Sequence, residues 1–324
     1  MDQPIPIPGE IPVEIPKPEL EEPKTKINVW LKSVLSLALF VALWYFVFGL
    51  DWVKLVVITA IILFHELGHF FAMKKFKYND LGIFFIPFLG AYVSGSKQEV
   101  SQKQSAIILL AGPVPGIILG ILFLLIPGND EIMFFSTVSL NEIAKWSILL
   151  NLLNLLPIYP LDGGQLLHRL FLDSSQIIGR IFLIASAALL TLIAISTEIY
   201  PLLIFPFMMI TRLIREMQHE RIEKKIEAEG IDLVKTYEQI TAEEYWRTRN
   251  VLIKHYPQLR DVKPSPPYEI SPKEDQIITI IQGLLQRNII QDLSLAGKFL
   301  ILVIWVGCFA TSFFFLNLSM TRFF

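Results

Sequence analysis

The residues of this chain best suited to chemistry are two histidines and a glutamate in an apolar stretch at residues 61–73, IILFHELGHFFAM. His65 and His69 are four residues apart, so on a helix both imidazoles project from one face and can bind a single metal ion. Glu66 follows the first histidine directly, in the position of a general base beside such an ion. An ionised side chain at the centre of a membrane helix costs about 2.5 to 3.5 kcal/mol. The pattern therefore predicts a metal site within a membrane segment.

A catalytic zinc site needs a third protein ligand and one position left open for water. Asp162 is the best candidate, because it directly follows the proline-broken end of an apolar span, NLLNLLPIYPLDGG. His168, at a basic boundary, and Glu142, at the other end of that span, are the competing candidates. Asp162 could instead cap a helix that begins at the two glycines. The single cysteine, Cys308, lies in an apolar run, so histidine and carboxylate side chains must supply the ligands.

The composition is that of a multi-pass membrane protein. Of the 324 residues, 53% are hydrophobic and 18% charged, and the mean hydropathy is +0.53. Soluble domains contain more charge and fewer apolar residues. A net charge of -2 gives no sign of the basic surface that nucleic-acid binding requires. The N-terminus lacks the charged-then-apolar pattern of a removable signal peptide.

Apolar stretches suited to crossing about 30 Å of hydrocarbon recur along the chain. They predict an all-α protein with about six to seven spans, near residues 29–50, 52–73, 104–126, 140–156, 177–196, 200–210 and 294–318. The third span contains AGPVPG, which predicts a kinked and closely packed helix. Residues 81–96 combine glycine and proline with β-branched and aromatic residues, and this favours a small membrane-associated β-hairpin or a re-entrant element.

The remaining segments divide the chain into four parts. We expect a disordered proline-rich tail at 1–28, a transmembrane domain at 29–212, a helical cytoplasmic region at 213–293 and a C-terminal transmembrane helix at 294–324. Lysine and arginine are concentrated before the first span and after the second, fourth and sixth spans. Because basic loops remain in the cytoplasm, the N-terminus and residues 213–293 are predicted to lie there, or in the equivalent compartment of an organelle.

Two motifs of this sequence form a recognisable pair. His65-Glu66-Leu67-Gly68-His69 stands with the downstream run NLLPIYPLDG, residues 154–163. Together they resemble the signature of the site-2 protease family of intramembrane zinc metalloproteases. PFLGAYV, residues 87–93, is similar to that family's strand segment, and AGP, residues 111–113, is similar to its third-helix motif. The tail, the cytoplasmic region and the last span lie outside the resemblance.

The resemblance implies a role for individual residues. It implies that His65, His69 and Asp162 bind one Zn²⁺ per chain and that Glu66 is the general base. Asn154 is similar to the family's asparagine near the metal, where its amide could donate to the substrate carbonyl or the oxyanion. A hydrogen bond between helices is the alternative role for this asparagine.

The hairpin residues Pro87, Gly90 and Tyr92 are expected to contact the substrate, because a strand edge there could pair with an extended peptide. We therefore expect a zinc endopeptidase, integral to a bacterial inner membrane or an organelle equivalent. Its expected partners are the lipid bilayer and other membrane proteins, and not nucleic acid. We expect it to cleave the transmembrane or juxtamembrane segments of those proteins in regulated intramembrane proteolysis. The alternative is a non-proteolytic scaffold or adaptor that retains the fold. The sequence does not indicate an oligomeric state.

Overall fold

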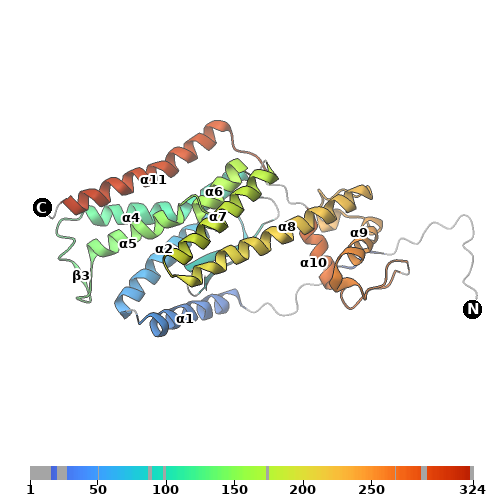
Figure 1. Cartoon of the computed structure of the whole chain (residues 1–324), viewed down its shortest axis with the longest axis horizontal. Coiled ribbons are helices and arrows are strands. Elements are labelled where there is room, and N and C mark those ends of the chain that lie inside the picture. Colours follow the sequence, from blue (N-terminus) through green and yellow to red (C-terminus); the bar gives the residue numbers. More distant parts are fainter. Residues whose placement is uncertain are drawn as a thin grey trace, which may run out of the picture. The chain divides into compact units, whose positions relative to one another are not determined.

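Helices dominate the chain in a computed structural model (Figure 1). The structure describes residues 16–19, 28–49, 51–86, 90–97, 100–172, 175–266, 268–285 and 290–321. The chain divides into two compact units, each considered by itself. We call Lys26–Leu213 with Ile289–Phe324 the membrane unit, and Ile214–Asn288 with Met1–Thr25 the helical unit.

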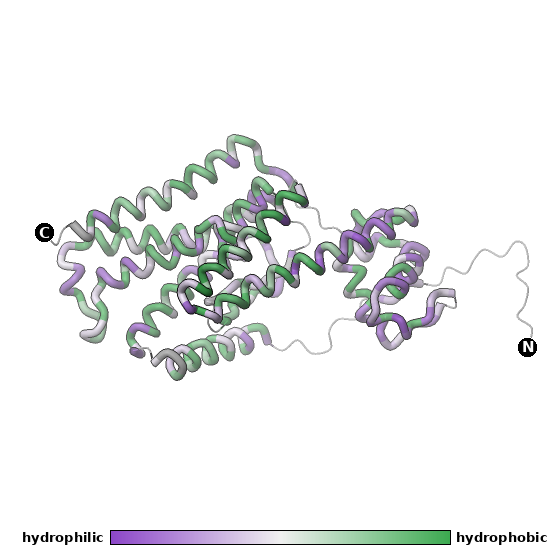
Figure 2. The backbone as a smooth tube through the Cα atoms, viewed as in Figure 1, coloured by the Kyte–Doolittle hydropathy of each residue, from purple (hydrophilic) through white to green (hydrophobic). Residues whose placement is uncertain are grey.

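Five segments of the described chain are helical, long and apolar enough to cross a membrane. They are α1 (Val29–Phe48), α2 (Trp52–Lys75), the consecutive helices α3 (Gln102–Ala111) and α4 (Pro113–Leu125), α7 (Gln176–Ser196), and α11 (Leu295–Thr321). Figure 2 shows these helices as predominantly hydrophobic, whereas α9 and α10 carry many polar residues. The prediction of a helical multi-pass protein is confirmed.

Two of the predicted spans differ from a full-length membrane helix. The fourth corresponds to α5 (Leu140–Asn154), which has 15 residues and is shorter than the roughly 20 that a straight crossing needs. The sixth is a 3₁₀ turn, η2 (Tyr200–Leu203), followed by the start of α8 (Ile204–Ala228). α5 instead packs along α4, and α11 contacts both helices (Figure 1).

The predicted kink in the third span is a break between α3 and α4. Gly112 ends α3, and Pro113 begins α4 as its first residue. Proline has no N–H to donate but fits the first turn of a helix, so the chain can restart helical structure immediately. Further along, α6 (Asp162–Leu167) and the π-helix η1 (His168–Leu172) follow the loop that ends α5.

The predicted hairpin is confirmed as β1 (Asn79–Ile86) and β2 (Gly90–Ser96), an antiparallel pair in which Phe84 lies opposite Tyr92. Alternate side chains of β1 pack against α1 and α2, with Phe40, Phe70, Ile83 and Phe85 buried together. A second hairpin was not predicted. It pairs β3 (Met133–Phe134) with β4 (Val138–Ser139), strands too short to produce a periodic sequence signal.

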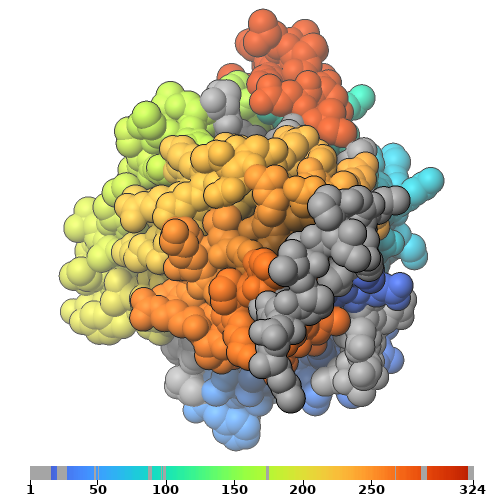
Figure 3. Space-filling model, turned by 90° about the vertical axis from the view of Figure 1, so that its right-hand side faces the viewer, coloured from blue at the N-terminus to red at the C-terminus, as the bar shows by residue number. Residues whose placement is uncertain are grey.

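The helical unit has its own hydrophobic core. It contains the polar part of α8, η3 (Tyr237–Gln239), α9 (Ala242–His255), η4 (Pro257–Leu259) and α10 (Glu274–Leu284). Its buried residues include Ile226, Ile231, Leu252, Leu259, Ile277 and Ile281. The side chains of its helices form a continuous body in Figure 3. A capping box of Thr241 with Glu244 begins α9.

The N-terminal tail is described at residues 16–19, and the other residues of the predicted disordered segment, apart from Asn28, lie outside the described part. Lys17 and Pro18 form hydrogen bonds with the helical unit around Tyr237. The disorder of the tail stays a prediction. Asn28 accepts a hydrogen bond from the backbone N–H of Trp30 and caps α1.

Candidate metal centre

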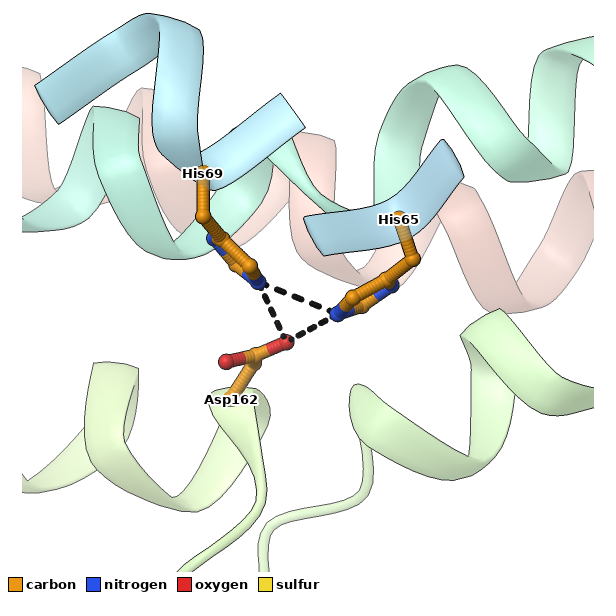
Figure 4. A group of neighbouring side chains, drawn as sticks. All are labelled: His65, His69 and Asp162. Carbon is orange, nitrogen blue, oxygen red and sulfur yellow. Dashed lines mark hydrogen bonds and ion pairs between the residues drawn. The ribbon is translucent and has the colours of Figure 1, made fainter. Parts of the chain in front are cut away.

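Two helices bring the three predicted ligands together (Figure 4). His65 and His69 lie one turn apart on α2 and are 5% and 7% exposed, and Asp162 is the first residue of α6. The Oδ2 atom of Asp162 is 3.1 Å from Nε2 of His65 and 3.3 Å from Nε2 of His69. The two Nε2 atoms are 3.0 Å apart. Three ligand atoms therefore face one common point.

The donor set fits a tetrahedral zinc ion. Zinc bonds of about 2.0–2.2 Å to nitrogen and oxygen place neighbouring ligand atoms about 3.3–3.6 Å apart. The distances between the Nε2 and Oδ2 atoms, 3.0–3.3 Å, are within a few tenths of an ångström of this range. Two imidazoles and one carboxylate supply three protein ligands, the number typical of a catalytic zinc site whose fourth position binds water.

The other ring nitrogen of each histidine is already bound within the protein. Nδ1 of His65 is 2.7 Å from Oδ1 of Asn151, and Nδ1 of His69 is 2.7 Å from the carbonyl oxygen of Ile108. Both partners accept hydrogen bonds, so each Nδ1 carries the proton and each Nε2 presents its lone pair to a metal. The Asn151 amide is itself oriented, because its Nδ2 donates to the Ser147 carbonyl at 2.7 Å.

These two orienting groups were not identified from the sequence. Asn151 carried a weak signal as a polar residue in an apolar helix, three positions before Asn154. The Ile108 carbonyl carried none, because every residue has a carbonyl group. It belongs to the last turn of α3, where carbonyls lack partners within the helix and are available to other groups.

Glycine allows the backbone to approach the site closely. A Cβ atom placed on Gly112 would lie 2.3 Å from Nε2 of His69, and one on Gly163 would lie 1.9 Å from the carbonyl oxygen of Leu155. Both distances are far below van der Waals contact. The glycines of the AGP and LDGG motifs therefore permit α3 to pack against the histidine and the Asp162 loop to fold against the end of α5.

Asp162 does not cap a helix, and the competing candidate ligands Glu142 and His168 make other contacts. The N-cap residue of α6 is Leu161, which makes no side-chain cap bond, so the alternative of Asp162 as a cap is not what the structure has. Glu142 completes a capping box with Ser139 at the start of α5. The ring of His168 lies 6.3 Å from that of Tyr159, centroid to centroid, and is not part of the ligand group.

The remaining predicted site residues differ in how far the structure describes them. Glu66 is 5% exposed on α2, beside His65, and Asn154 is the half-buried last residue of α5. Tyr92 on β2 is 47% exposed and its ring lies 5.6 Å from that of Phe84. Gly90 begins β2 with a positive φ of 99°. Pro87 lies outside the described residues, and the roles of these residues stay predictions.

Known proteins match this chain across the same region. Residues 53–139 match the family described as Peptidase family M50. The chain is 31% identical over 149 residues to stage IV sporulation protein FB of Bacillus subtilis, covering 45% of this chain and 51% of that protein. It is 25% identical over 142 residues to a zinc metalloprotease of Methanocaldococcus jannaschii, covering 44% of this chain and 41% of that protein. The chain thus spans about half, or less, of these curated relatives.

A solved structure of the site-2 protease from Methanocaldococcus jannaschii aligns with a TM-score of 0.41 and 20% identity, over 55% of this chain and 84% of that one. The apolar helices, the HELGH motif and the group of His65, His69 and Asp162 are the features expected of a membrane-bound metallopeptidase. Within that class, peptidase family M50 is the family whose model matches residues 53–139, in agreement with the site-2 protease family that the sequence motifs resemble.

Proposed function

We propose that this chain is an intramembrane zinc endopeptidase that cleaves transmembrane or juxtamembrane segments of other membrane proteins. The observation that carries the proposal is the convergence of His65, His69 and Asp162 within the membrane unit, with Glu66 buried beside them. A buried site of this kind has no evident packing purpose, because charged and polar side chains inside a membrane are costly. The match of residues 53–139 to a peptidase family supports the same reaction class.

His65, His69 and Asp162 would hold the zinc ion. When bound, this ion supplies Lewis-acid activation of water and of the scissile carbonyl. Glu66 would accept the proton of the attacking water and return it to the leaving nitrogen, so that the amine departs in neutral form. Asn151 and the Ile108 carbonyl keep both imidazoles in the tautomer and orientation that binding requires.

Asn154 is proposed to act on the substrate and not on the ligands. It lies at the end of α5, in the turn of helix that follows Asn151. Its amide is proposed to donate to the carbonyl oxygen as negative charge develops on it.

Strand β2 is proposed to hold the substrate in an extended form. In the described residues, β2 forms a two-stranded sheet with β1. A peptide that pairs with the strand edge is extended, and its carbonyl groups are accessible to attack. In a helical substrate, the carbonyl groups are bonded within the helix. Gly90 and Tyr92 on this strand, and Pro87 before it, are the proposed contacts.

The distribution of basic residues supports the proposed orientation. Lys74 and Lys75 end α2, shortly after the two histidines. Positive loops remain cytoplasmic, so the site is proposed to lie toward the cytoplasmic face, with the N-terminus and residues 213–293 on the same side. Cleavage there would release a membrane-tethered regulator or remove a residual signal peptide, which is the regulated proteolysis that we propose.

The decisive test compares the purified wild-type chain with Glu66→Gln. We expect the wild type to contain one zinc per chain by elemental mass spectrometry, and Glu66→Gln to keep the zinc while losing at least 10²-fold in cleavage rate. Glu131→Gln, at an exposed loop position, is the matched control and should cleave normally. Comparative membrane proteomics of wild type and Glu66→Ala would identify substrates. Unimpaired cleavage by Glu66→Gln would contradict the role of Glu66 as general base. A wild type that contains no zinc and does not cleave would favour the scaffold alternative.

A further inference from the structure

Lys17, in the described part of the N-terminal tail, contacts residues 237–240 of the helical unit. The Nζ atom of Lys17 lies 2.5 Å from the carbonyl oxygen of Tyr237, 2.7 Å from that of Ile240 and 3.1 Å from that of Glu238. More than 200 residues separate the lysine from these partners in the sequence. Three carbonyl groups therefore converge on one ammonium group at the end of η3.

The aromatic ring of Tyr237 completes the surroundings of this lysine. Nζ of Lys17 lies 5.0 Å from the ring centroid, within the range of a cation–π interaction. The hydroxyl of Tyr237 donates a hydrogen bond of 2.9 Å to the Pro18 carbonyl. Tyr237 is 5% exposed and meets the ring of Tyr245 edge-on, which fixes its position in the core of the unit.

The charge and protonation of the surroundings suit a cation. Burial, together with the charges of Glu274 and Glu238, raises the pKa of Tyr237 to about 12, so its hydroxyl remains a donor at neutral pH. Hydrogen bonds from its own backbone and from Thr236 lower the pKa of the Glu238 carboxyl. The positive charge of Lys17 makes a smaller contribution in the same direction.

The chemistry distinguishes this arrangement from nonspecific charge attraction. A primary ammonium has three N–H donors, which match three convergent carbonyl oxygens, whereas a guanidinium is a planar fork suited to carboxylates. Pro16 and Pro18 flank the lysine and restrict the backbone to an extended form before it binds, which lowers the entropy lost on docking.

We propose that Tyr237, Glu238 and Ile240 form a binding site for a proline-flanked lysine, the lysine notch, and that the Pro16-Lys17-Pro18 segment of this chain is its ligand. The docked segment is an intramolecular clasp between the N-terminal tail and the helical unit. Because the segment is tethered, its effective concentration at the notch is in the millimolar range, and weak contacts suffice to keep it bound.

The first test measures the accessibility of Lys17 in the full-length chain. The protein in detergent is treated briefly with an amine-acetylating reagent, and each lysine's rate, from mass spectrometry, is normalised to its rate in the denatured chain. We expect Lys17 to react at least tenfold more slowly than Lys224, whose side chain is 70% exposed in the same unit. Millimolar synthetic peptide VEIPKPELEE should accelerate labelling of Lys17, and the same peptide with glutamine in place of lysine should not. Equal normalised rates for Lys17 and Lys224 would overturn the proposal.

The second test uses that peptide, carrying a fluorophore, with the full-length Lys17→Gln chain. We expect it to bind this chain at least tenfold more tightly than the wild type, whose notch is already filled. An arginine-substituted peptide should bind at least fivefold more weakly, and Tyr237→Phe added to Lys17→Gln should weaken binding severalfold. Lys224→Gln is the matched control and should bind like the wild type. Absence of binding to Lys17→Gln at millimolar peptide, or equal binding to it and to the wild type, contradicts the lysine notch.

Discussion

At the scale of single residues, each metal-site histidine uses its two ring nitrogens differently. The Nε2 atoms of His65 and His69 face Asp162, while their Nδ1 atoms bond to Asn151 and to the Ile108 carbonyl. An imidazole that donates from Nδ1 is a better ligand through Nε2, because its tautomer and orientation are fixed in advance. Asn151 therefore belongs to the candidate site as the group that orients His65.

We predict that Asn151→Ala lowers zinc affinity by about 10- to 100-fold, since the orienting acceptor of His65 is lost. Competition with a chelator of known affinity measures this change. Asn154→Ala, one turn further along α5, is the matched control. It should keep zinc affinity within about twofold, while cleavage falls by about 10²-fold if its amide acts on the oxyanion. Zinc loss in Asn154→Ala and not in Asn151→Ala would reverse the two roles.

At the scale of elements, close approach between α2 and α3 positions the site. Ile108 and Gly112 both contact His69 from the last turn of α3, one through its carbonyl and the other through the absence of a side chain. The break between Gly112 and Pro113 ends α3 at this level. The kink therefore makes the Ile108 carbonyl available to Nδ1 of His69 and leaves room for the His69 ring beside Gly112.

Gly112→Ala is expected to displace the His69 ring, because the added methyl carbon would lie 2.3 Å from Nε2. We predict less than stoichiometric zinc in the purified variant, measured by elemental mass spectrometry. Gly307→Ala is the matched control, since a Cβ atom there meets nothing within 4 Å on α11. It should retain full zinc. Stoichiometric zinc of unchanged affinity in Gly112→Ala would show that α3 adjusts without disturbing the ligand.

The start of α9 provides a pH-dependent contribution to stability. Partial burial disfavours the charged form of Glu244, but hydrogen bonds from Lys235 and from the Thr241 backbone outweigh this effect and lower the pKa. A lowered carboxyl pKa stabilises the folded state above the unfolded pKa of about 4.3, and this stabilisation is lost as the pH falls through the folded pKa.

Glu244→Gln is therefore predicted to destabilise α9 at pH 7 by roughly 0.3–1 kcal/mol. Hydrogen exchange of α9 peptides, with both proteins compared at the same pH, measures the difference. The difference should shrink as the pH falls below about 4, where the wild-type carboxylate protonates. Glu243→Gln is the control, because the side chain of Glu243 is 79% exposed. A difference between Glu244→Gln and wild type that persists unchanged in acid would refute an electrostatic origin.

At the scale of the whole molecule, the chain combines two units with different cores. The membrane unit buries small apolar clusters between its helices, and the helical unit buries one larger cluster. Inside the helical unit, Arg249 is 1% exposed, pairs with Glu274 at 2.8 Å and donates to surrounding carbonyls. The attraction within this pair and the further hydrogen bonds of Arg249 offset the cost of removing both charges from water.

The separate polypeptide of residues 214–288 is accordingly expected to fold. We predict a helical circular-dichroism spectrum and a cooperative urea transition. Arg249→Ala, which leaves the Glu274 carboxylate buried without its partner, should lower the free energy of unfolding by about 3–5 kcal/mol. Arg247→Ala, at an exposed position two residues earlier, should change it by less than about 1 kcal/mol. A non-cooperative transition in the unmodified polypeptide would show that this unit needs the rest of the chain.

Features that depend on neighbouring residues could be predicted from the sequence. Helical periodicity places His65 and His69 on one face of a helix. Local glycine, proline and β-branched residues predict the kink and the hairpin. The contacts between distant residues are visible only in the tertiary structure: Asn151 and the Ile108 carbonyl bond to the histidines, Asp162 lies at their Nε2 atoms, and Lys17 occupies the lysine notch. Such contacts join residues far apart in the chain, and a carbonyl oxygen has no sequence signature. Packing alone selects the ones that are used.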